Sequence, residues 1–205
     1  MSNVMEDILA KIRDIDGLPT YEEARFLIKL FEIQKQIFPG EKSWSGYCKE
    51  NGNIWSVYTV EFIDGLATKL EKLGEGPIIE IFASDGKLSH HLRKRGIEII
   101  ATDISPNISG NRDLVERLAY DEALKTYKPR IVIAGWPTTG RQSVINFPTV
   151  NHYIEFPYPN KAGYKVYGDG LQLVLLTDVS KYYVCCGDDF NGHFNHETRL
   201  FNKPK

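Results

Sequence analysis

The stretch Pro77-Ile-Ile-Glu-Ile-Phe-Ala-Ser-Asp-Gly-Lys-Leu-Ser-His-His-Leu92 decides the fold of this chain. It opens with an apolar run from Ile78 to Phe82 that carries one acid, Glu80, and a small polar turn, Ala83 to Gly86, follows. Two leucines then recur at helical spacing. The pattern predicts a buried strand, a sharp turn and a helix whose amino end faces the turn. Such a junction suits an anionic or polar ligand, because free N–H groups and the positive end of the helix dipole meet there.

From Pro77 onward the chain alternates between strand-like and helix-like segments, which is typical of a parallel sheet with helical crossovers. The next apolar segments predict strands at Ile97–Asp103, Arg130–Pro137 and His152–Phe156. The intervening segments predict helices at 112–118, at 120–127 and around Ser143. We therefore expect an α/β fold built on a mostly parallel sheet.

The C-terminal part predicts an antiparallel end to this sheet. The segments Leu171–Leu176 and Tyr182–Cys186, joined through Thr177–Lys181, predict a hairpin. Thr198–Phe201 predicts an edge strand. Residues 157–170 are dense in Pro, Gly, Asn and Tyr, so we expect a loop there.

Two helices are expected before residue 40. Apolar residues recur on one helical face between Met5 and Ile15, and Thr20-Tyr-Glu-Glu23 has the form of a capping box that starts a helix reaching about Ile37. This pair either packs on the main domain or covers its site, or it forms an independent module that binds a partner.

Residues 41–55 are rich in turn formers and aromatic side chains, so we expect an irregular loop. Its aromatic residues either wall a ligand site or fix the loop to the core. A further helix is expected to begin near Ser56 and to end at Gly74. The predicted domains are a helical segment with the aromatic loop at 1–55 and an α/β domain at 56–205.

The composition is ordinary for a globular protein, with 42% apolar and 25% charged residues, and a chain of 205 residues can bury a substantial core. The net charge of −2 gives no whole-molecule attraction to nucleic acid or to an anionic membrane, so we expect neither partner. No leader and no membrane-spanning run is visible, and three cysteines make no disulfide framework. The expected location is the cytoplasm.

An acid, Asp103, ends the strand that follows the opening stretch, 23 residues after Glu80. In open α/β sheets, ligands bind outside the carboxyl ends of the strands, and an acid in this position accepts hydrogen bonds from both hydroxyls of a ribose. Asp103 either holds a ribose in this way or caps its own turn with Ser105. The spacing of the strand, turn and helix before it favours the ribose.

The segments Ile79–Leu92 and Ile99–Ser105 together resemble the class I S-adenosylmethionine-dependent methyltransferases. That family has an apolar strand with an acid, a Gly-x-Gly-x-Gly turn, a helix and a second strand ending in an acid. The resemblance covers roughly residues 56–156. It implies a Rossmann-like sheet closed by an antiparallel strand pair, which suits the predicted hairpin, and S-adenosylmethionine as cofactor, released as S-adenosylhomocysteine.

The resemblance also implies the residues that bind the cofactor. The acid matching Glu80 orients the turn and the amino group of the methionine, the turn backbone lines the cofactor, and Asp103 holds the ribose. A residue after the third strand flanks the adenine. No clear third strand is visible, and Ala119-Tyr120 is the nearest candidate. The implied cofactor-binding residues are Glu80, Phe82, Ala83, Ser84, Gly86, Asp103, Ile104, Ala119 and Tyr120.

The turn departs from the family pattern, because the three glycines fall on Phe82, Ser84 and Gly86 and only the last is kept. Glycine tolerates positive φ and lets the backbone approach a ligand closely. The ring of Phe82 is therefore expected to narrow or reshape the pocket, while Ser84 is a mild change. The Gly-x-Gly-x-x-Gly fingerprint of nicotinamide enzymes is absent as well.

The turn after the fourth strand, Gly135-Trp136-Pro137, is implied to face the methyl group and the substrate. The aromatic loop at 41–58, with Tyr58, is expected to hold the substrate as well. Methyltransferases that act on nucleobase amines carry Asn/Asp-Pro-Pro-Tyr there, and the polar first residue is missing here. A small-molecule acceptor is therefore favoured. Trp136 either stacks on a flat substrate or on the adenine, or belongs to the core. Methyl transfer needs little beyond proximity and a dry site, so no catalytic residue is assigned.

Two functions stay open, a methyltransferase with an unidentified acceptor and a non-catalytic protein of the same fold that acts as a binding partner. Other candidate sites are weaker. His90-His91, next to Arg93–Arg95, predict a solvated helix face rather than a phosphate-contacting patch. The polar cluster of Asp188, Asp189, His193 and His196 fits no standard zinc spacing, so we expect a turn and no metal.

Overall fold

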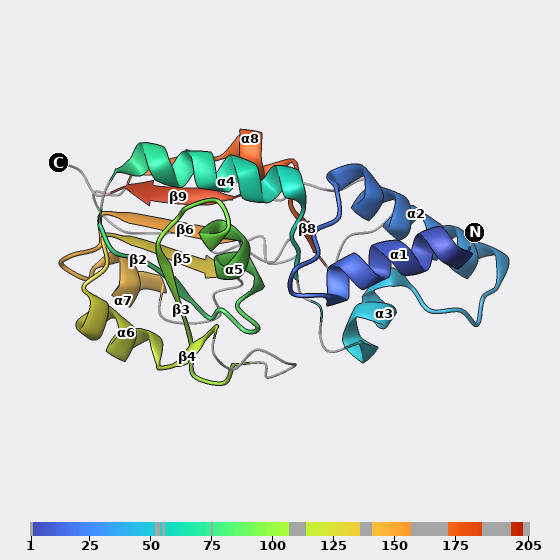
Figure 1. Ribbon diagram of the computed structural model, residues 1–205, viewed down its shortest axis with the longest axis horizontal. Coiled ribbons are helices and arrows are strands. Elements are labelled where there is room, and N and C mark those ends of the chain that lie inside the picture. The colour runs from blue at the N-terminus through green and yellow to red at the C-terminus, as the bar shows by residue number, and fades with distance from the viewer. Residues whose placement is uncertain are drawn as a thin grey trace. The chain divides into compact units, whose positions relative to one another are not determined.

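The computed structural model describes residues 2–51, 54, 56–74, 76–106, 114–135, 141–156, 172–185 and 198–202 (Figure 1). The chain divides into two compact units. The first consists of Met1–Gly65 with Asp178–His196, and the second of Leu66–Thr177 with Glu197–Lys205. Within the described part of the chain, none of the helices combines the length and the apolar character needed to cross a membrane.

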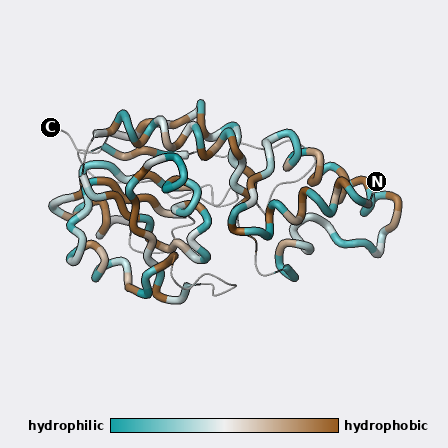
Figure 2. The backbone as a smooth tube through the Cα atoms, viewed as in Figure 1, coloured by the Kyte–Doolittle hydropathy of each residue, from teal (hydrophilic) through white to brown (hydrophobic). Residues whose placement is uncertain are grey.

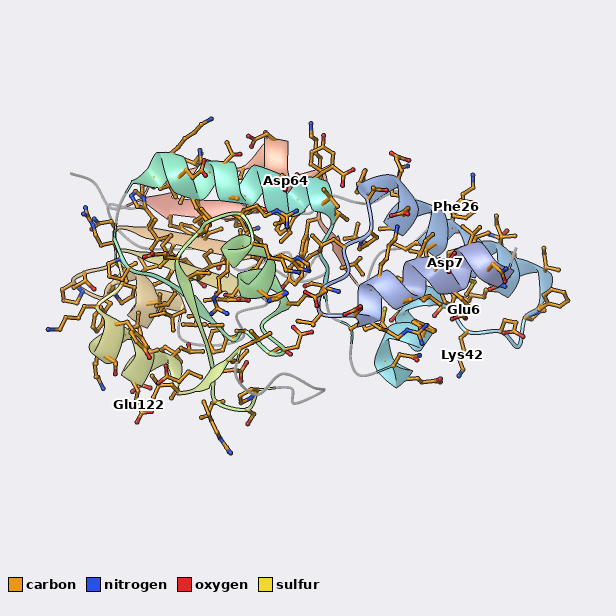
Figure 3. All side chains as sticks on the ribbon, in the orientation of Figure 1. Glu6, Asp7, Phe26, Lys42, Asp64 and Glu122 are labelled. Atoms are coloured by element: carbon orange, nitrogen blue, oxygen red, sulfur yellow. The ribbon has the colours of Figure 1, made fainter. Side chains whose placement is uncertain are left out.

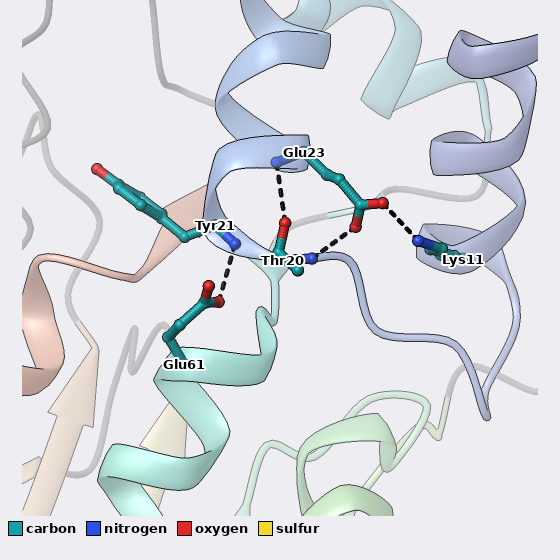
Figure 4. Close-up of polar contacts among 5 residues, drawn as sticks. All are labelled: Lys11, Thr20, Tyr21, Glu23 and Glu61. Carbon is teal, nitrogen blue, oxygen red and sulfur yellow. Dashed lines mark hydrogen bonds and ion pairs between the residues drawn. The ribbon is translucent and has the colours of Figure 1, made fainter.

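The helices of the first unit are α1 (Ser2–Arg13), α2 (Tyr21–Ile37) and α3 (Trp44–Glu50), and α4 (Val60–Leu73) and α8 (Thr177–Ser180) begin or end in it. The predicted capping box of α2 is confirmed. The Thr20 hydroxyl accepts the Glu23 N–H at 3.2 Å, and the Glu23 carboxylate accepts the Thr20 N–H at 2.7 Å (Figure 4). Lys11 of α1 pairs with Glu23 at 2.5 Å, and the Tyr21 N–H donates to the Glu61 carboxylate at 2.8 Å.

The predicted loop at 41–55 is wrong over its middle part, where α3 forms. The Ser43 hydroxyl starts this helix by accepting the Gly46 N–H at 3.2 Å. Trp44 is fully buried, and its ring lies 5.6 Å from that of Phe31. These aromatic residues therefore fix the segment to the core of the first unit. Not every apolar side chain of this unit is buried. Phe26 of α2, for example, is 45% exposed (Figure 3).

A short strand precedes α4, so the helix predicted from Ser56 begins later, at Val60. β1 (Ser56–Val57) pairs antiparallel with β8 (Val184–Cys185). The Thr59 hydroxyl explains the later start, because it accepts the Phe62 N–H at 3.2 Å as a helix cap does and also donates to the Tyr182 carbonyl at 3.0 Å.

Within the described residues of the second unit, a seven-stranded sheet has the order β4-β3-β2-β5-β6-β9-β7. Its strands are β2 (Ile78–Ile81), β3 (Ile99–Asp103), β4 (Glu116–Arg117), β5 (Ile131–Gly135), β6 (His152–Phe156), β7 (Gln172–Leu175) and β9 (Arg199–Asn202). The first five in this spatial order are parallel, and β9 is antiparallel to both neighbours. When the five parallel strands are numbered by their order in the chain, they lie side by side in the order 3-2-1-4-5, as in doubly wound nucleotide-binding sheets. The sheet is therefore Rossmann-like, as predicted.

The strand order reverses at β2, which pairs with β3 on one side and with β5 on the other. Helix α5 (Lys87–Arg93) follows β2, while α6 (Tyr120–Tyr127) and α7 (Arg141–Ile145) pack their apolar residues on the face that carries Ile79 and Ile81. Glu80 alternates with these two residues and so points to the face that α5 covers. Figure 2 shows the apolar residues concentrated along the strands.

The predicted C-terminal pairing is wrong in its partners. β7 pairs with β9 and not with 182–186, and a helix, α8, occupies Thr177–Ser180. The strand predicted at the edge lies between β6 and β7. An antiparallel pair does close the sheet, but its two strands are far apart in the sequence, whereas the prediction joined neighbours.

The helix predicted at 112–118 is also wrong in its described part. Residues 116–117 form β4, which pairs in parallel with Thr102 and Asp103. Residues 112–113 and the predicted loop at 157–170 lie outside the described residues. β4 is therefore the third strand that the sequence did not reveal, and it ends two residues before Ala119.

Candidate functional site

The turn after β2 has a left-handed backbone at three alternating positions. Phe82 has φ 59°, Ser84 has φ 53° and Gly86 has φ 75°. These are the three positions at which the resemblance places glycine. A Cβ at Gly86 would lie 2.5 Å from a methyl group of Val115, so glycine is required there both for its conformation and for space.

The turn is tied to β3 by hydrogen bonds. The Ala83 N–H donates to the Thr102 carbonyl at 3.1 Å, and the Ser84 N–H donates to Asp103 Oδ2 at 2.9 Å. A non-glycine residue with left-handed φ costs on the order of 1–2 kcal/mol, so two of them need such support from their surroundings. The carboxylate of Asp103 therefore helps to hold the turn in its strained path.

Asp103 also caps its own turn, because Oδ1 accepts the Ser105 N–H at 2.7 Å. The capping interpretation of Asp103 is thus confirmed. The donors among the described residues do not use up the carboxylate, since its two oxygens offer about four lone-pair sites and the two N–H groups occupy one each. The half-buried side chain keeps acceptor capacity for two further donors, such as the hydroxyls of a ribose.

Glu80 lies beneath the turn and is only 2% exposed. Its Oε2 accepts two hydrogen bonds from α5, from the Ser89 N–H at 3.1 Å and from the Ser89 hydroxyl at 2.5 Å. Burial raises the pKa of the Glu80 carboxyl to about 8, although the Ser89 hydroxyl acts in the opposite direction. A buried acid with a raised pKa beside a ligand-type turn is a common feature of functional sites.

Glu80→Gln should make the protein more stable above neutral pH. The pKa of the folded form, about 8, exceeds the unfolded value of 4.5, so stability from this group is complete below pH 4.5 and is lost as the pH rises toward 8. Glutamine removes this loss. We expect the free energy of unfolding to exceed that of wild type by about 2–4 kcal/mol at pH 8 and by little at pH 5. Urea unfolding at both pH values measures it.

The matched control for this prediction is Glu98→Gln, which changes an exposed acid next to β3. Its unfolding free energy should follow that of wild type at both pH values. A Glu80→Gln profile parallel to wild type across this range would contradict the prediction.

The ring of Phe82 is half-buried and points toward α6. Its centroid lies 5.8 Å from that of Tyr120, with 50° between the ring planes, and both rings pack against the apolar cluster under α6 and α7. Ala119 and Tyr120 form the N-cap and the first residue of α6. Ile104, the residue after Asp103, is 62% exposed. Exposed or half-buried apolar side chains thus lie at the carboxyl end of the sheet.

The structure brings most of the predicted cofactor residues together around one strand junction. Phe82, Ala83, Ser84, Gly86 and Asp103 belong to the turn and its anchor. Of the other members, Glu80 lies within β2, Ile104 follows β3, and Ala119 and Tyr120 begin α6. Trp136 and Pro137 lie outside the described residues. Tyr58 belongs to the first unit, and its predicted role stays a prediction.

Comparison with known proteins gives only a weak likeness. No family model and no curated protein matches the chain. A solved structure titled as a co-crystal structure of WbdD and the kinase inhibitor LY294002 is 12% identical, with a TM-score of 0.41. The match covers 70% of this chain and 39% of that chain, so the chain spans less than half the length of that protein. At this TM-score the likeness carries no argument, and the fold assignment depends on the strand order.

Two residues of the site were missed by the sequence reasoning. Ser89 holds Glu80, and Arg117 of β4 donates from Nε to the Ile104 carbonyl at 3.2 Å. A polar residue in the first turn of the helix after an acid-bearing strand is a usable signal for Ser89. No sequence signal pointed to Arg117, because its segment was predicted as a helix and not as a strand.

The predicted solvated face at His90-His91 is wrong for His91, which is 2% exposed. Helical spacing explains this, because His91 follows the fully buried Leu88 by three residues and lies beside it. Burial lowers the pKa of His91 to about 4, with a further lowering by Lys87. The predicted turn with Asp188, Asp189, His193 and His196 lies outside the described residues.

An open cavity of about 1120 Å³ lies away from this site. It is lined by the amino ends of β2 and β3 and by the loops before them, including Gly74, Gly76 and Gly96. Parallel sheets of this type bind ligands at the opposite, carboxyl edge. The strand ends, rather than the cavity, therefore mark the candidate site.

Proposed function

We propose that this chain binds S-adenosylmethionine over the turn from Phe82 to Gly86 and transfers its methyl group to a small-molecule acceptor. The observation that carries the proposal is the turn itself. Three alternating positions, two of them without glycine, keep positive φ, and the acid at the end of the next strand binds the N–H of the middle one. The residue types differ from the glycines of the resembled family, yet the left-handed backbone is present at all three positions although it costs energy.

The side chains around the turn suit a nucleoside. Asp103 has acceptor capacity left for two ribose hydroxyls, and the exposed Ile104 and the half-buried Tyr120 are apolar residues near it that a base could contact. The site lies at the switch point between β2 and β5, where sheets of this class hold nucleotides. The arrangement supports a ligand with an adenosine part.

The chemistry that the cofactor supplies when bound is an activated methyl group. The chain's own residues bind and orient this donor and keep water from it. Proximity and orientation provide most of the acceleration of such a transfer, so the proposal requires no acid or base among the described residues.

Calorimetric titration with S-adenosylhomocysteine tests the proposal. We expect saturable heat with one site per chain. Absence of heat at high ligand concentration, with circular dichroism showing folded protein, would sink the methyltransferase function.

Phe82→Gly should bind S-adenosylhomocysteine at least as tightly as wild type, and up to about tenfold more tightly. Glycine removes the bulky ring from the pocket and adopts positive φ without strain. Calorimetry on both proteins measures the ratio. Phe82→Leu is the control, since leucine keeps the bulk at positive φ and should show no gain. Much weaker binding by Phe82→Gly would mean that the ring is a cofactor contact.

A non-catalytic protein of the same fold is the second candidate. The position of Phe82 favours it, because the ring already packs on Tyr120, the residue expected beside the adenine. If the ring blocks the ligand, wild type should show no heat with S-adenosylhomocysteine while Phe82→Gly does.

A further inference from the structure

Helix α2 has two apolar faces, and only one of them is buried. The buried face includes Phe31, whose ring centroid lies 5.6 Å from that of Trp44 and 5.1 Å from that of Tyr47 in α3. This face therefore belongs to the core of the first unit. The other face, which we call the outer stripe, consists of one half-buried residue, Leu30, and three exposed ones, Phe26, Ile33 and Ile37.

Exposed apolar side chains are concentrated in this part of the chain. Among the described residues, six large apolar side chains are exposed, and all but Ile104 lie in α1, in α2 or directly after α2. Single exposed apolar residues are normal on a protein surface. The outer stripe is different, because its members line up along one helix and expose on the order of 300 Å² together, a size at which surface patches are often interaction sites.

The spacing of the outer stripe fits a helical partner. From Phe26 to Ile37 its members follow one another at intervals of four, three and four residues. These are the a/d intervals of helices that pack knobs into holes, where each apolar residue inserts between four residues of the facing helix. The chemistry of the stripe therefore points to a second helix with apolar residues at the same intervals.

The outer stripe is complementary to itself when a second copy of α2 runs in the opposite direction. A two-fold axis midway between Leu30 and Ile33 sets Leu30 of each copy beside Ile33 of the other. The same axis sets Phe26 of each copy beside Ile37 of the other. All four members then have an apolar partner, and both copies use the same patch, as an interface with two-fold symmetry requires.

The charges along α2 agree with this arrangement. Lys29 and Gln36 border the outer stripe on one side and Gln34 borders it on the other, while Glu32 and Lys35 lie away from it by helical spacing. In the antiparallel pair, Lys29 of each copy faces Gln36 of the other. No like charges stand directly opposite each other between Phe26 and Ile37, so charge does not oppose the contact of two copies.

We propose that α2 forms the interface of a homodimer, in which two copies pack their outer stripes against each other in antiparallel orientation. With the bordering side chains, the pair buries on the order of 1,000 Å² in total, the lower limit of a specific interface. The dissociation constant is therefore expected in the micromolar range. This proposal is independent of the proposed function, because α2 contains none of the residues of the candidate site.

Sedimentation equilibrium of the whole chain at about 1–100 µM tests the proposal, and wild type should show a reversible monomer–dimer equilibrium. Ile33→Glu puts a carboxylate in the middle of the stripe and should raise the dissociation constant at least about 100-fold. Lys35→Gln, which changes the net charge equally on the opposite side of α2, should leave it unchanged. Circular dichroism checks that each variant is folded. A wild type that stays monomeric, or a dimer that tolerates Ile33→Glu, overturns the proposal.

Charge changes at exposed positions test the orientation without disturbing the core. Gln36→Glu creates an ion pair with Lys29 of the other copy on each side of the axis, so it should tighten the dimer about three- to tenfold at low salt. Gln36→Lys should weaken the dimer by a similar factor, and the double variant Lys29→Glu/Gln36→Lys should restore it. In a parallel pair Lys29 faces Gln34 instead. A gain from Gln34→Glu but not from Gln36→Glu overturns the antiparallel arrangement.

Discussion

Replacing Asp103 with alanine should weaken the binding of S-adenosylhomocysteine by about 100-fold. The variant loses two hydrogen bonds from ribose hydroxyls to a charged carboxylate, and each is worth about 1.5 kcal/mol or slightly less in a half-buried position. Their sum corresponds to about two powers of ten in the dissociation constant. Calorimetric titration of both proteins at one pH measures the loss, which would be among the largest for any single side chain of the site.

The control must separate this role from the support that Asp103 gives to the turn through Ser84 and Ser105. Adenosine and 2′,3′-dideoxyadenosine differ only in the ribose hydroxyls. Wild type should prefer adenosine strongly, and Asp103→Ala should bind the two nucleosides equally. An equal loss of affinity for both nucleosides on substitution would contradict a ribose contact and leave Asp103 as a cap of the turn.

The strand, turn and helix of the site were predictable because each has a local signal. The apolar run at 78–82, the small turn and the acid at 103 are all visible within short windows, and the structure confirms the strand ends that they predict. The left-handed φ of Phe82 and Ser84 was not visible, since neither residue type favours it. Among the described residues, the hydrogen bonds that the turn donates to a second strand and the packing of the ring against α6 hold these residues there.

The C-terminal half of the sheet shows where local reasoning ends. Neighbouring strands in a sequence usually pair, so the segments around 171–176 and 182–186 predict a hairpin. In the structure, β8 belongs to the first unit and β9 pairs with β7 across the intervening chain. Which strand completes a sheet depends on how much apolar surface each candidate buries, and that depends on residues far apart in the sequence rather than on any short window.

Phe201→Ala should destabilise the protein by about 3–5 kcal/mol, the range for emptying a buried phenylalanine site. Phe201 is 2% exposed, and its ring stacks on that of Tyr153 at 5.8 Å, in the cluster beneath α6 and α7. Its strand has a hydrogen-bonded neighbour on each side, so the surrounding structure has little freedom to collapse into the cavity. Urea unfolding followed by circular dichroism measures the change.

Phe147→Ala is the matched control, because Phe147 packs against the same cluster but stays partly exposed. It should cost less than half as much as Phe201→Ala. The comparison also tests the position of β9, since a strand at the edge of the sheet could shift to fill the space and would lower the cost. A loss for Phe201→Ala as small as that for Phe147→Ala would place β9 at an edge, against the strand order observed. A large difference would support the position of β9 between β6 and β7, with Phe201 in the core beneath α6 and α7.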